Sequence, residues 1–326
     1  LMSNEASSVF AALAEIVGED WVKTDPADLQ TYGTDWTKQF PVAPSVIVLP
    51  KTVAEVQAVV KLANEATLKI VPSGGRTGLS GGAVATNGEV VLVLDRMNQI
   101  LDFNAADRQV TCEAGVVTEQ LQQFAESQGL FYPVDFASSG SSQLGGNVAT
   151  NAGGIKVIRY GMTRSWVTGM KVVTGRGDLL DLNRGLTKNA TGYDFRHLFI
   201  GSEGTLGIIV EVTMALSVPP QDPAVLIMGV EDMTKTMPVL EAFQNKVSIT
   251  AFEFFSEQAL RHVIAEKKLA RPIETASNFY ALLEYEQRGK EDLEDAMVLF
   301  EHCLDLIMIN VIVVDYYTHF IKNILL

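Results

Sequence analysis

The segment VPSGGRTGLSGG (Val71–Gly82) constrains the fold of this chain more than any other, because it places five glycines directly after an apolar run typical of a strand. Glycine loses more backbone entropy on folding than other residues and has no side chain to pack, so such a run needs a structural reason. One reason is a flexible loop. The other is close approach of backbone N–H groups to an anion, assisted by Arg76 and the hydroxyls of Ser73, Thr77 and Ser80.

Two common phosphate-binding motifs do not match this segment. A P-loop requires a lysine followed by Ser or Thr, and the segment has no lysine. The Rossmann fingerprint G-x-G-x-x-G has a different spacing and opens a helix. Two more segments rich in small polar residues, 138–154 and 201–207, also occupy strand ends, and a dinucleotide is long enough to pass all three. The residues alone leave a dinucleotide site and ordinary turns equally open.

Composition excludes several classes of partner. The formal net charge is −14, and the 25 Lys and Arg residues are spread along the chain, which disfavours nucleic acid and anionic membranes. Cys112 and Cys303 provide neither a disulfide framework nor zinc-ligand spacing, which suits a reducing compartment. We see no signal-peptide pattern at the start, and the longest apolar run, 306–314, is too short to span a bilayer. We therefore expect a cytoplasmic protein without a transmembrane segment.

The periodicity of the chain predicts two α/β parts separated by a proline-rich linker. A strand, an amphipathic helix over 52–66, a strand, the glycine loop and another strand compose the first unit. Prolines at 217–223 interrupt both helix and sheet, and a β-α-β-α-β-α series follows. The predicted organisation is an N-terminal helical segment over 1–40, a domain over 41–217 with subdomains of about 41–100 and 101–217, and a second domain over 218–326.

Several motifs together resemble one known family. In chain order they are PSGGRTGLSGG, GGNVATNAGG, RYG (Arg159–Gly161), TGYDFRHLFIGSEGTLGII and AFEFF. They resemble the FAD-linked oxidases of the vanillyl-alcohol oxidase and p-cresol methylhydroxylase type, over about Pro41 to Cys303. Within that family the chain looks most like D-2-hydroxyglutarate dehydrogenases, glycolate oxidase flavin subunits and D-lactate dehydrogenases. The resemblance implies an α+β fold: a two-subdomain FAD-binding domain of the p-cresol methylhydroxylase type, followed by a truncated α+β substrate (cap) domain.

The resemblance also implies which residues contact FAD. In the family, the first glycine loop cradles the pyrophosphate, the second segment forms another wall and the third closes on the adenosine end. None of the histidines (His197, His262, His302 and His319) lies in a glycine segment, and Cys112 lies within a predicted strand, so the flavin is expected to be non-covalent. The implied contacts are Pro72, Ser73, Gly74, Gly75, Arg76, Thr77, Gly78, Leu79, Ser80, Pro133, Asp135, Ser141, Ser142, Gly145, Gly146, Asn147, Thr150, Asn151, Gly153, Glu203, Gly204 and Ile209.

The implied activity is oxidation of a D-2-hydroxy acid of the 2-hydroxyglutarate, lactate or glycolate class. Electrons would pass from FAD to an electron-transfer flavoprotein, quinone or similar acceptor, and a homodimer is one assembly that the resemblance allows. We assign no catalytic residue. The family's zinc-binding histidine cluster is not found, and from about residue 304 the tail no longer resembles the family. A catalytically incomplete FAD-binding fragment is therefore the alternative. A nicotinamide-dependent cell-wall precursor reductase of the same superfamily fits the TGYD and AFEF segments less well.

Overall fold

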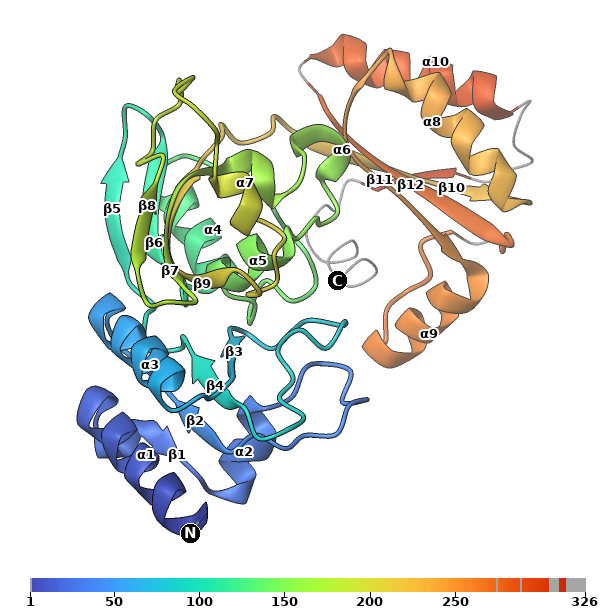
Figure 1. Cartoon of the computed structure of the whole chain (residues 1–326). Helices are drawn as coiled ribbons and strands as arrows, with labels where there is room; N and C mark the ends of the chain where they lie inside the picture. Colours follow the sequence, from blue (N-terminus) through green and yellow to red (C-terminus); the bar gives the residue numbers. More distant parts are fainter. Residues whose placement is uncertain (1, 274, 288, 305–310, 315–326) are drawn as a thin grey trace. The chain divides into compact units, whose positions relative to one another are not determined.

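The structure is a computed structural model that describes residues 2–273, 275–287, 289–304 and 311–314 (Figure 1). Its contacts divide the chain into two compact units. Unit 1 comprises Leu1–Tyr132, Ser138–Ala152 and Thr163–Ser217. Unit 2 comprises Pro133–Ala137, Gly153–Met162 and Val218–Leu326, so two short segments that precede residue 217 belong to it.

The first sheet of unit 1 is the predicted strand–helix–strand–loop–strand series. Its strand order is β1-β2-β4-β3, with β2, β4 and β3 parallel and β1 antiparallel at the edge. Thr52 caps the helix by accepting a hydrogen bond from the backbone N–H of Glu55. The Glu55 carboxylate accepts from the N–H of Lys51 at 2.7 Å, one residue before the N-cap donor that a capping box would use. The elements are β1 (Val22–Lys23), β2 (Val46–Val48), α3 (Val53–Glu65), β3 (Ile70–Ser73) and β4 (Val90–Val93).

One face of this sheet packs against the short helix α2 (Pro26–Tyr32). Ile47, Val91 and Val93 are fully buried and form a cluster with Leu29 and Tyr32 of α2. The long helices α1 (Met2–Val17) and α3 pack against each other (Figure 1). The glycine loop begins at the carboxyl end of β3, where Ser73 pairs with Val93 of β4.

The second sheet of unit 1 is antiparallel, with strand order β5-β6-β9-β7-β8. The pattern GMKVVTGRGDLLDL is typical of a hairpin and forms β7 and β8, and GSEGTLGIIVEVTMAL is typical of a long strand and contains β9, whereas no local pattern indicates an element in the segment that forms α5. That helix contains two glycines, and its buried side includes Leu144 and Val148. The elements are β5 (Ile100–Asn104), β6 (Gln109–Glu113), α4 (Thr118–Ser127), α5 (Leu144–Thr150), η2 (Thr163–Trp166), β7 (Val167–Thr174), β8 (Leu179–Leu182), α7 (Arg196–Phe199) and β9 (Gly207–Ala215), and η1 (Glu19–Trp21) lies outside this sheet.

Unit 2 is built on an antiparallel sheet with strand order β11-β12-β10-β13. Three helices follow the strands in the alternation that the sequence predicts, and the short α6 packs on β11. The elements are α6 (Val157–Tyr160), β10 (Pro223–Val230), η3 (Met233–Lys235), α8 (Thr236–Gln244), β11 (Ser248–Ser256), α9 (Glu257–Lys267), β12 (Phe279–Glu286), α10 (Lys290–Leu304) and β13 (Val311–Val314).

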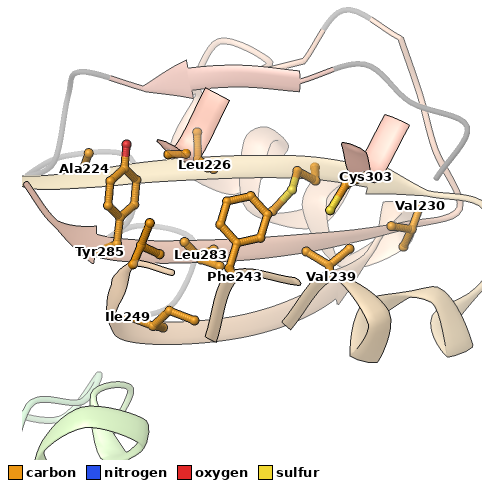
Figure 2. Packing of buried hydrophobic residues seen from close by; sticks show 12 residues of the cluster. Ala224, Leu226, Val230, Val239, Phe243, Ile249, Leu283, Tyr285 and Cys303 are labelled. Carbon is orange, nitrogen blue, oxygen red and sulfur yellow. The ribbon is translucent and has the colours of Figure 1, made fainter. Parts of the chain in front are cut away.

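Alternation along β10 produces the two cores of unit 2. Leu226 faces a cluster with Phe243 of α8 and Cys303 of α10, as Figure 2 shows. Its neighbour Ile227 faces the opposite cluster, with Leu260 of α9. Because successive side chains of a strand point to opposite faces, an almost continuous apolar run indicates a strand that is buried on both sides. The predicted mixed fold of helices and sheets is thus confirmed in both units.

Two predictions from the sequence concern the tail after about residue 304 and the absence of a transmembrane segment. The tail that departs from the family near residue 304 falls mostly on 305–310 and 315–326, which lie outside the described residues. Within the described part, 311–314 form β13, which pairs antiparallel with β10. None of the helices that the structure describes is both long enough and apolar enough to cross a bilayer.

An ionic network surrounds the Glu257 carboxylate at the start of α9. The Glu257 carboxylate accepts hydrogen bonds from Arg271 at 2.6 and 3.0 Å, from Tyr280 at 2.5 Å and from Arg261 at 2.7 Å. The Arg271 hydrogen bonds have the largest effect on the pKa of Glu257; burial opposes them, and the Tyr280 and Arg261 hydrogen bonds add to them. Together they lower this pKa to about 2 from an ordinary value of 4.5.

A group whose folded-state pKa is lowered stabilises the fold above its unfolded pKa, and this contribution disappears as the pH falls to the folded value. We therefore expect Glu257→Gln to cost about 2–3 kcal/mol at neutral pH. The difference between wild type and variant should shrink by more than half between about pH 6 and pH 3. Urea titrations across this pH range measure it. A difference that stayed constant with pH would show that the Glu257 charge contributes nothing.

Candidate cofactor site

The three glycine segments, far apart in sequence, lie side by side in unit 1, to which the second contributes its residues 138–152. A Cβ on Gly75 would lie 2.2 Å from the carbonyl oxygen of Ser141, so the first loop touches the second segment through its backbone. A Cβ on Gly204 would lie 3.1 Å from Pro72, so the third segment touches the first. The N–H of Glu203 donates to the carbonyl of Ala149 at 2.9 Å, which joins the third segment to α5. The close approaches explain why glycine is needed at these positions.

The first loop presents a run of free backbone donors. In the part of the chain that the structure describes, none of the backbone N–H groups from Gly75 to Ser80 donates to a carbonyl or side chain. Arg76 has φ +57°, and a Cβ on Gly78 would meet nothing within 4 Å. Successive unpaired N–H groups next to a left-handed residue are typical of an anion-binding concavity. The loop can therefore hold a phosphate without any lysine.

The loop is tied to the rest of the unit at its far end. The Asp35 carboxylate accepts hydrogen bonds from the N–H of Gly81 at 3.0 Å and from the hydroxyl and N–H of Thr37 at 2.7 and 3.0 Å. Burial by itself would raise the pKa of Asp35, but these hydrogen bonds, with one from Lys38, lower it below its ordinary value. Asp35 thus remains a charged anchor, and it holds the loop from the side opposite to β3.

The charge of Arg76 is largely compensated within the protein. Its guanidinium lies 3.2 Å from a carboxylate oxygen of Asp95, donates to the carbonyl of Gly74 at 2.6 Å and lies 4.9 Å from the centre of the Tyr32 ring. Asp95 also accepts from the side-chain amide of Gln143 at 2.7 Å. The glycine-rich pattern indicated Arg76 as a candidate site residue, whereas no pattern indicated Asp95 or Gln143. The only available signal for Gln143 was its position as the one long polar side chain in 138–146.

The second segment uses part of its polar side chains internally. The Asn147 amide donates to Thr118 Oγ1 at 2.6 Å, and Ser142 Oγ lies 2.7 Å from the same atom. All three side chains are buried. Gly145 packs against Ala114, where a Cβ would approach to 2.6 Å. Ser142 and Asn147 therefore attach α5 to α4, and their role as direct cofactor contacts stays a prediction.

The other predicted contacts are distributed over both units. In unit 1, Thr150 Oγ1 donates to the carbonyl of Gly146 at 3.0 Å, and Ile209 is buried within β9. A pocket of about 210 Å³ adjoins the third segment; its lining includes Pro72 and Gly204. Pro133, Asp135 and Gly153 belong to unit 2 and are not placed with the rest.

Cys112 lies within β6, as predicted, and is fully buried. Burial, and secondarily the charge of Glu211, raises the pKa of its thiol to about 12. Because the thiolate is the reactive form of cysteine, this thiol is poorly suited to a covalent flavin bond. We expect acid precipitation of the FAD-loaded chain to leave all the flavin in the supernatant. A pellet that retained flavin fluorescence would contradict a non-covalent site.

Metal ligands form no cluster in the described part of the chain: no group of three or more His, Cys, Asp or Glu side chains there is arranged to hold a metal ion.

Comparison with protein families identifies both parts of the chain. The family "FAD binding domain" matches residues 44–183, and "FAD linked oxidases, C-terminal domain" matches residues 219–317. The second match extends beyond residue 304, where similarity to the family is no longer evident by inspection of the sequence.

Curated relatives agree with these families. D-2-hydroxyglutarate dehydrogenase of Stutzerimonas stutzeri (strain A1501) is 59% identical over 293 residues, covering 90% of this chain and 63% of the relative. The mitochondrial D-2-hydroxyglutarate dehydrogenase of Bos taurus is 36% identical, covering 90% of this chain and 54% of the relative. The chain thus spans 63% and 54% of the lengths of these two relatives.

Solved structures share the fold. A structure of alkyldihydroxyacetonephosphate synthase has a TM-score of 0.79 at 22% identity and covers 98% of this chain and 62% of the other. Substrate-bound p-cresol methylhydroxylase has a TM-score of 0.77 at 19% identity and covers 99% of this chain and 69% of the other. The predicted fold, an FAD-binding domain of the p-cresol methylhydroxylase type with a cap domain, is confirmed.

The residues of unit 1 fit this cofactor. Free N–H groups in the first loop suit the acidic pyrophosphate, which accepts hydrogen bonds but has none to donate. The open space above Gly78 leaves room for the ligand. The chain belongs to the FAD-linked oxidases, and it contains the FAD-binding domain of that family followed by its C-terminal domain.

Proposed function

We propose that this chain takes part in the FAD-dependent oxidation of a D-2-hydroxy acid to the 2-oxo acid, with D-2-hydroxyglutarate as the first candidate substrate. The meeting of the three glycine segments in unit 1 is the observation that carries the FAD part of this proposal. The substrate is proposed from the relatives named D-2-hydroxyglutarate dehydrogenase. Lactate and glycolate are the other acids of the same class that we consider.

When bound, FAD would supply the hydride acceptor for oxidation of the 2-hydroxy acid at C2 to the 2-oxo acid. The residues of unit 1 contribute binding and orientation. The N–H groups from Gly75 to Ser80 would donate to the pyrophosphate, beside Arg76, whose guanidinium is paired with Asp95. The remaining predicted contacts that belong to unit 1 would line other parts of the cofactor. We assign no residue to proton transfer.

Partners and location follow as further parts of the proposal. Reduced cofactor must pass its electrons on, and an electron-transfer flavoprotein or a quinone is the proposed acceptor. A homodimer and a cytoplasmic location are proposed from the same resemblance; the relative from Bos taurus is a mitochondrial enzyme.

An anaerobic titration of the purified chain tests the proposal. The visible absorption spectrum is recorded after reconstitution with FAD and during stepwise addition of D-2-hydroxyglutarate and then D-lactate. Bleaching of the oxidised flavin's visible absorption band is expected with the first acid. L-2-Hydroxyglutarate is the matched control and should leave the band unchanged.

The other outcomes separate the parts of the proposal. Failure to bind any flavin would overturn the interpretation of the first loop as a phosphate cradle. A flavin that binds but stays oxidised with every acid would contradict the proposed oxidation and favour the alternative, a catalytically incomplete FAD-binding fragment. Bleaching with D-lactate alone would replace the candidate substrate.

A further inference from the structure

We propose that Gln143, oriented by Asp95, is a cofactor-binding residue whose side-chain oxygen accepts a hydrogen bond from an O–H or N–H group of bound FAD. This inference rests on the cofactor placement proposed above and deepens it. None of the motifs in the sequence points to Gln143, and it is absent from the contacts that the family resemblance implies.

The first observation is an acceptor without a partner. Only 7% of Gln143 is exposed, and its Oε1 atom is buried with no hydrogen-bond partner in the described part of the chain. Buried polar atoms are nearly always paired, since leaving one unpaired forfeits its hydration without compensation. A bound ligand that donates a hydrogen bond would remove this deficit.

The second observation is the direction in which this atom faces. A Cβ on Gly74 would lie 3.3 Å from Oε1 and 3.8 Å from the Cα of Gly146. The unpaired oxygen therefore lies where the first and second glycine segments meet. A side chain on Gly74 would crowd this place, whereas glycine leaves it open.

The third observation is that Asp95 decides which end of the amide faces the segments. The Gln143 Nε2 atom lies 2.7 Å from Asp95 Oδ1, and the other carboxylate oxygen of Asp95 lies 3.2 Å from Arg76. An ionised carboxylate only accepts hydrogen bonds, so the NH₂ group must face Asp95 and the oxygen must face the glycine segments. Asp95 is thus a positioning residue, and it acts on the cofactor through Gln143.

The chemistry of the acceptor limits what it can contact. The pyrophosphate has only acceptor oxygens and a negative charge, so it cannot satisfy an amide oxygen. The ribityl and ribose hydroxyls, the N3–H of the flavin ring and the adenine amino group can. The N–H donors of the first loop suit the phosphates of FAD, and the acceptor oxygen of Gln143 suits one of its hydroxyl or N–H groups. The two therefore bind different parts of the cofactor.

The test compares Gln143→Met with wild type in FAD titrations of the apo chain, followed by flavin fluorescence. Loss of one neutral hydrogen bond is expected to raise the dissociation constant about tenfold. Gln57→Met is the matched control, because Gln57 makes one amide hydrogen bond to Gly177, outside the three segments, and it should leave the constant unchanged. Thermal melting of each apo variant verifies that it is folded.

Modified cofactors identify the donor without any substitution in the protein. Wild type is titrated with 3-methyl-FAD, which lacks N3–H, and with FAD analogues that lack single ribityl or ribose hydroxyls. One analogue should bind about tenfold more weakly than FAD to wild type, yet bind to Gln143→Met as FAD does. Equal losses for every analogue in both proteins would overturn the inference, as would unchanged FAD affinity in folded Gln143→Met.

Asp95→Asn tests the positioning role. The new amide can donate to Gln143, which allows that side chain to turn its NH₂ group toward the glycine segments. We expect weaker FAD binding and a shifted flavin absorption band. Adding Gln143→Met to the Asp95→Asn variant should have a smaller effect than the same substitution has in wild type. Full additivity would show that Asp95 does not act through Gln143.

These titrations need no hydroxy acid, so their result is separate from the proposed oxidation. If the chain binds FAD but oxidises no acid, the FAD titrations alone decide whether Gln143 binds the cofactor. A wild-type chain that binds no FAD would overturn the cofactor placement and this inference together.

Discussion

Replacing Lys156 by methionine is expected to lower the free energy of unfolding by about 3–5 kcal/mol. The Lys156 Nζ atom lies 2.6 Å from Glu284 Oε1, and the two side chains are only 5% and 2% exposed. Thr250 Oγ1 donates to the same carboxylate oxygen. Removing the ammonium leaves a buried carboxylate with an uncompensated charge, which costs far more than the pair itself contributes. Urea-induced unfolding followed by circular dichroism measures the loss.

Two variants separate this effect from a general effect of losing a lysine. Lys171→Met breaks the ion pair with Glu211, at 2.8 Å, whose side chains are 33% and 17% exposed, so it should cost about 1 kcal/mol or less. Lys156→Met/Glu284→Gln removes the uncompensated charge but keeps an acceptor for Thr250, and it should recover most of the stability. A Lys156→Met loss as small as that of Lys171→Met would contradict the buried-charge explanation.

Gly75→Ala is expected to disrupt the site and to cost about 3 kcal/mol in stability. The added methyl group would lie 2.2 Å from the carbonyl oxygen of Ser141 and 2.8 Å from the Cα of Ser142. Both atoms belong to the backbone, so a side-chain rotation cannot relieve the contact, and the first and second segments must separate. Thermal melting of the apo chain and an FAD titration should both change, with affinity for FAD falling about 100-fold or more.

Gly78→Ala in the same loop is the matched comparison. A Cβ there would meet nothing within 4 Å, and the residue is not among the glycines with positive φ. The apo chain should therefore melt at the wild-type temperature or slightly above it. FAD affinity should nevertheless fall, because the methyl group would occupy space that we assign to the pyrophosphate. Unchanged FAD affinity would remove Gly78 from the proposed contacts, and an unchanged melting temperature in Gly75→Ala would contradict the close packing of the segments.

Local patterns in the sequence were sufficient for most elements. The amphipathic helix predicted over 52–66 is observed as α3, and the β-α-β-α-β-α series predicted after the linker is observed from β10 to α10. The helix α5 was missed because two of its seven residues are glycine, which ordinarily opposes a helix. It forms because Gly145 allows its backbone to approach Ala114 and because Leu144 and Val148 are buried. Tertiary packing here outweighs local propensity.

The sequence by itself determined the family, the mixed fold and the three glycine segments, because motifs, periodicity and caps depend on neighbours a few residues apart. Only the tertiary structure decided which segments meet and which charges pair. Asp95 is 48 positions from Gln143, and Lys156 is 128 positions from Glu284. Such pairs leave no regular spacing in the sequence from which they could be predicted. The packing of the sheets and helices, rather than proximity along the chain, brings their side chains together. The oriented acceptor of Gln143 therefore follows from the fold, whereas the sequence indicated the glycine loop as a candidate anion site and left ordinary turns equally open.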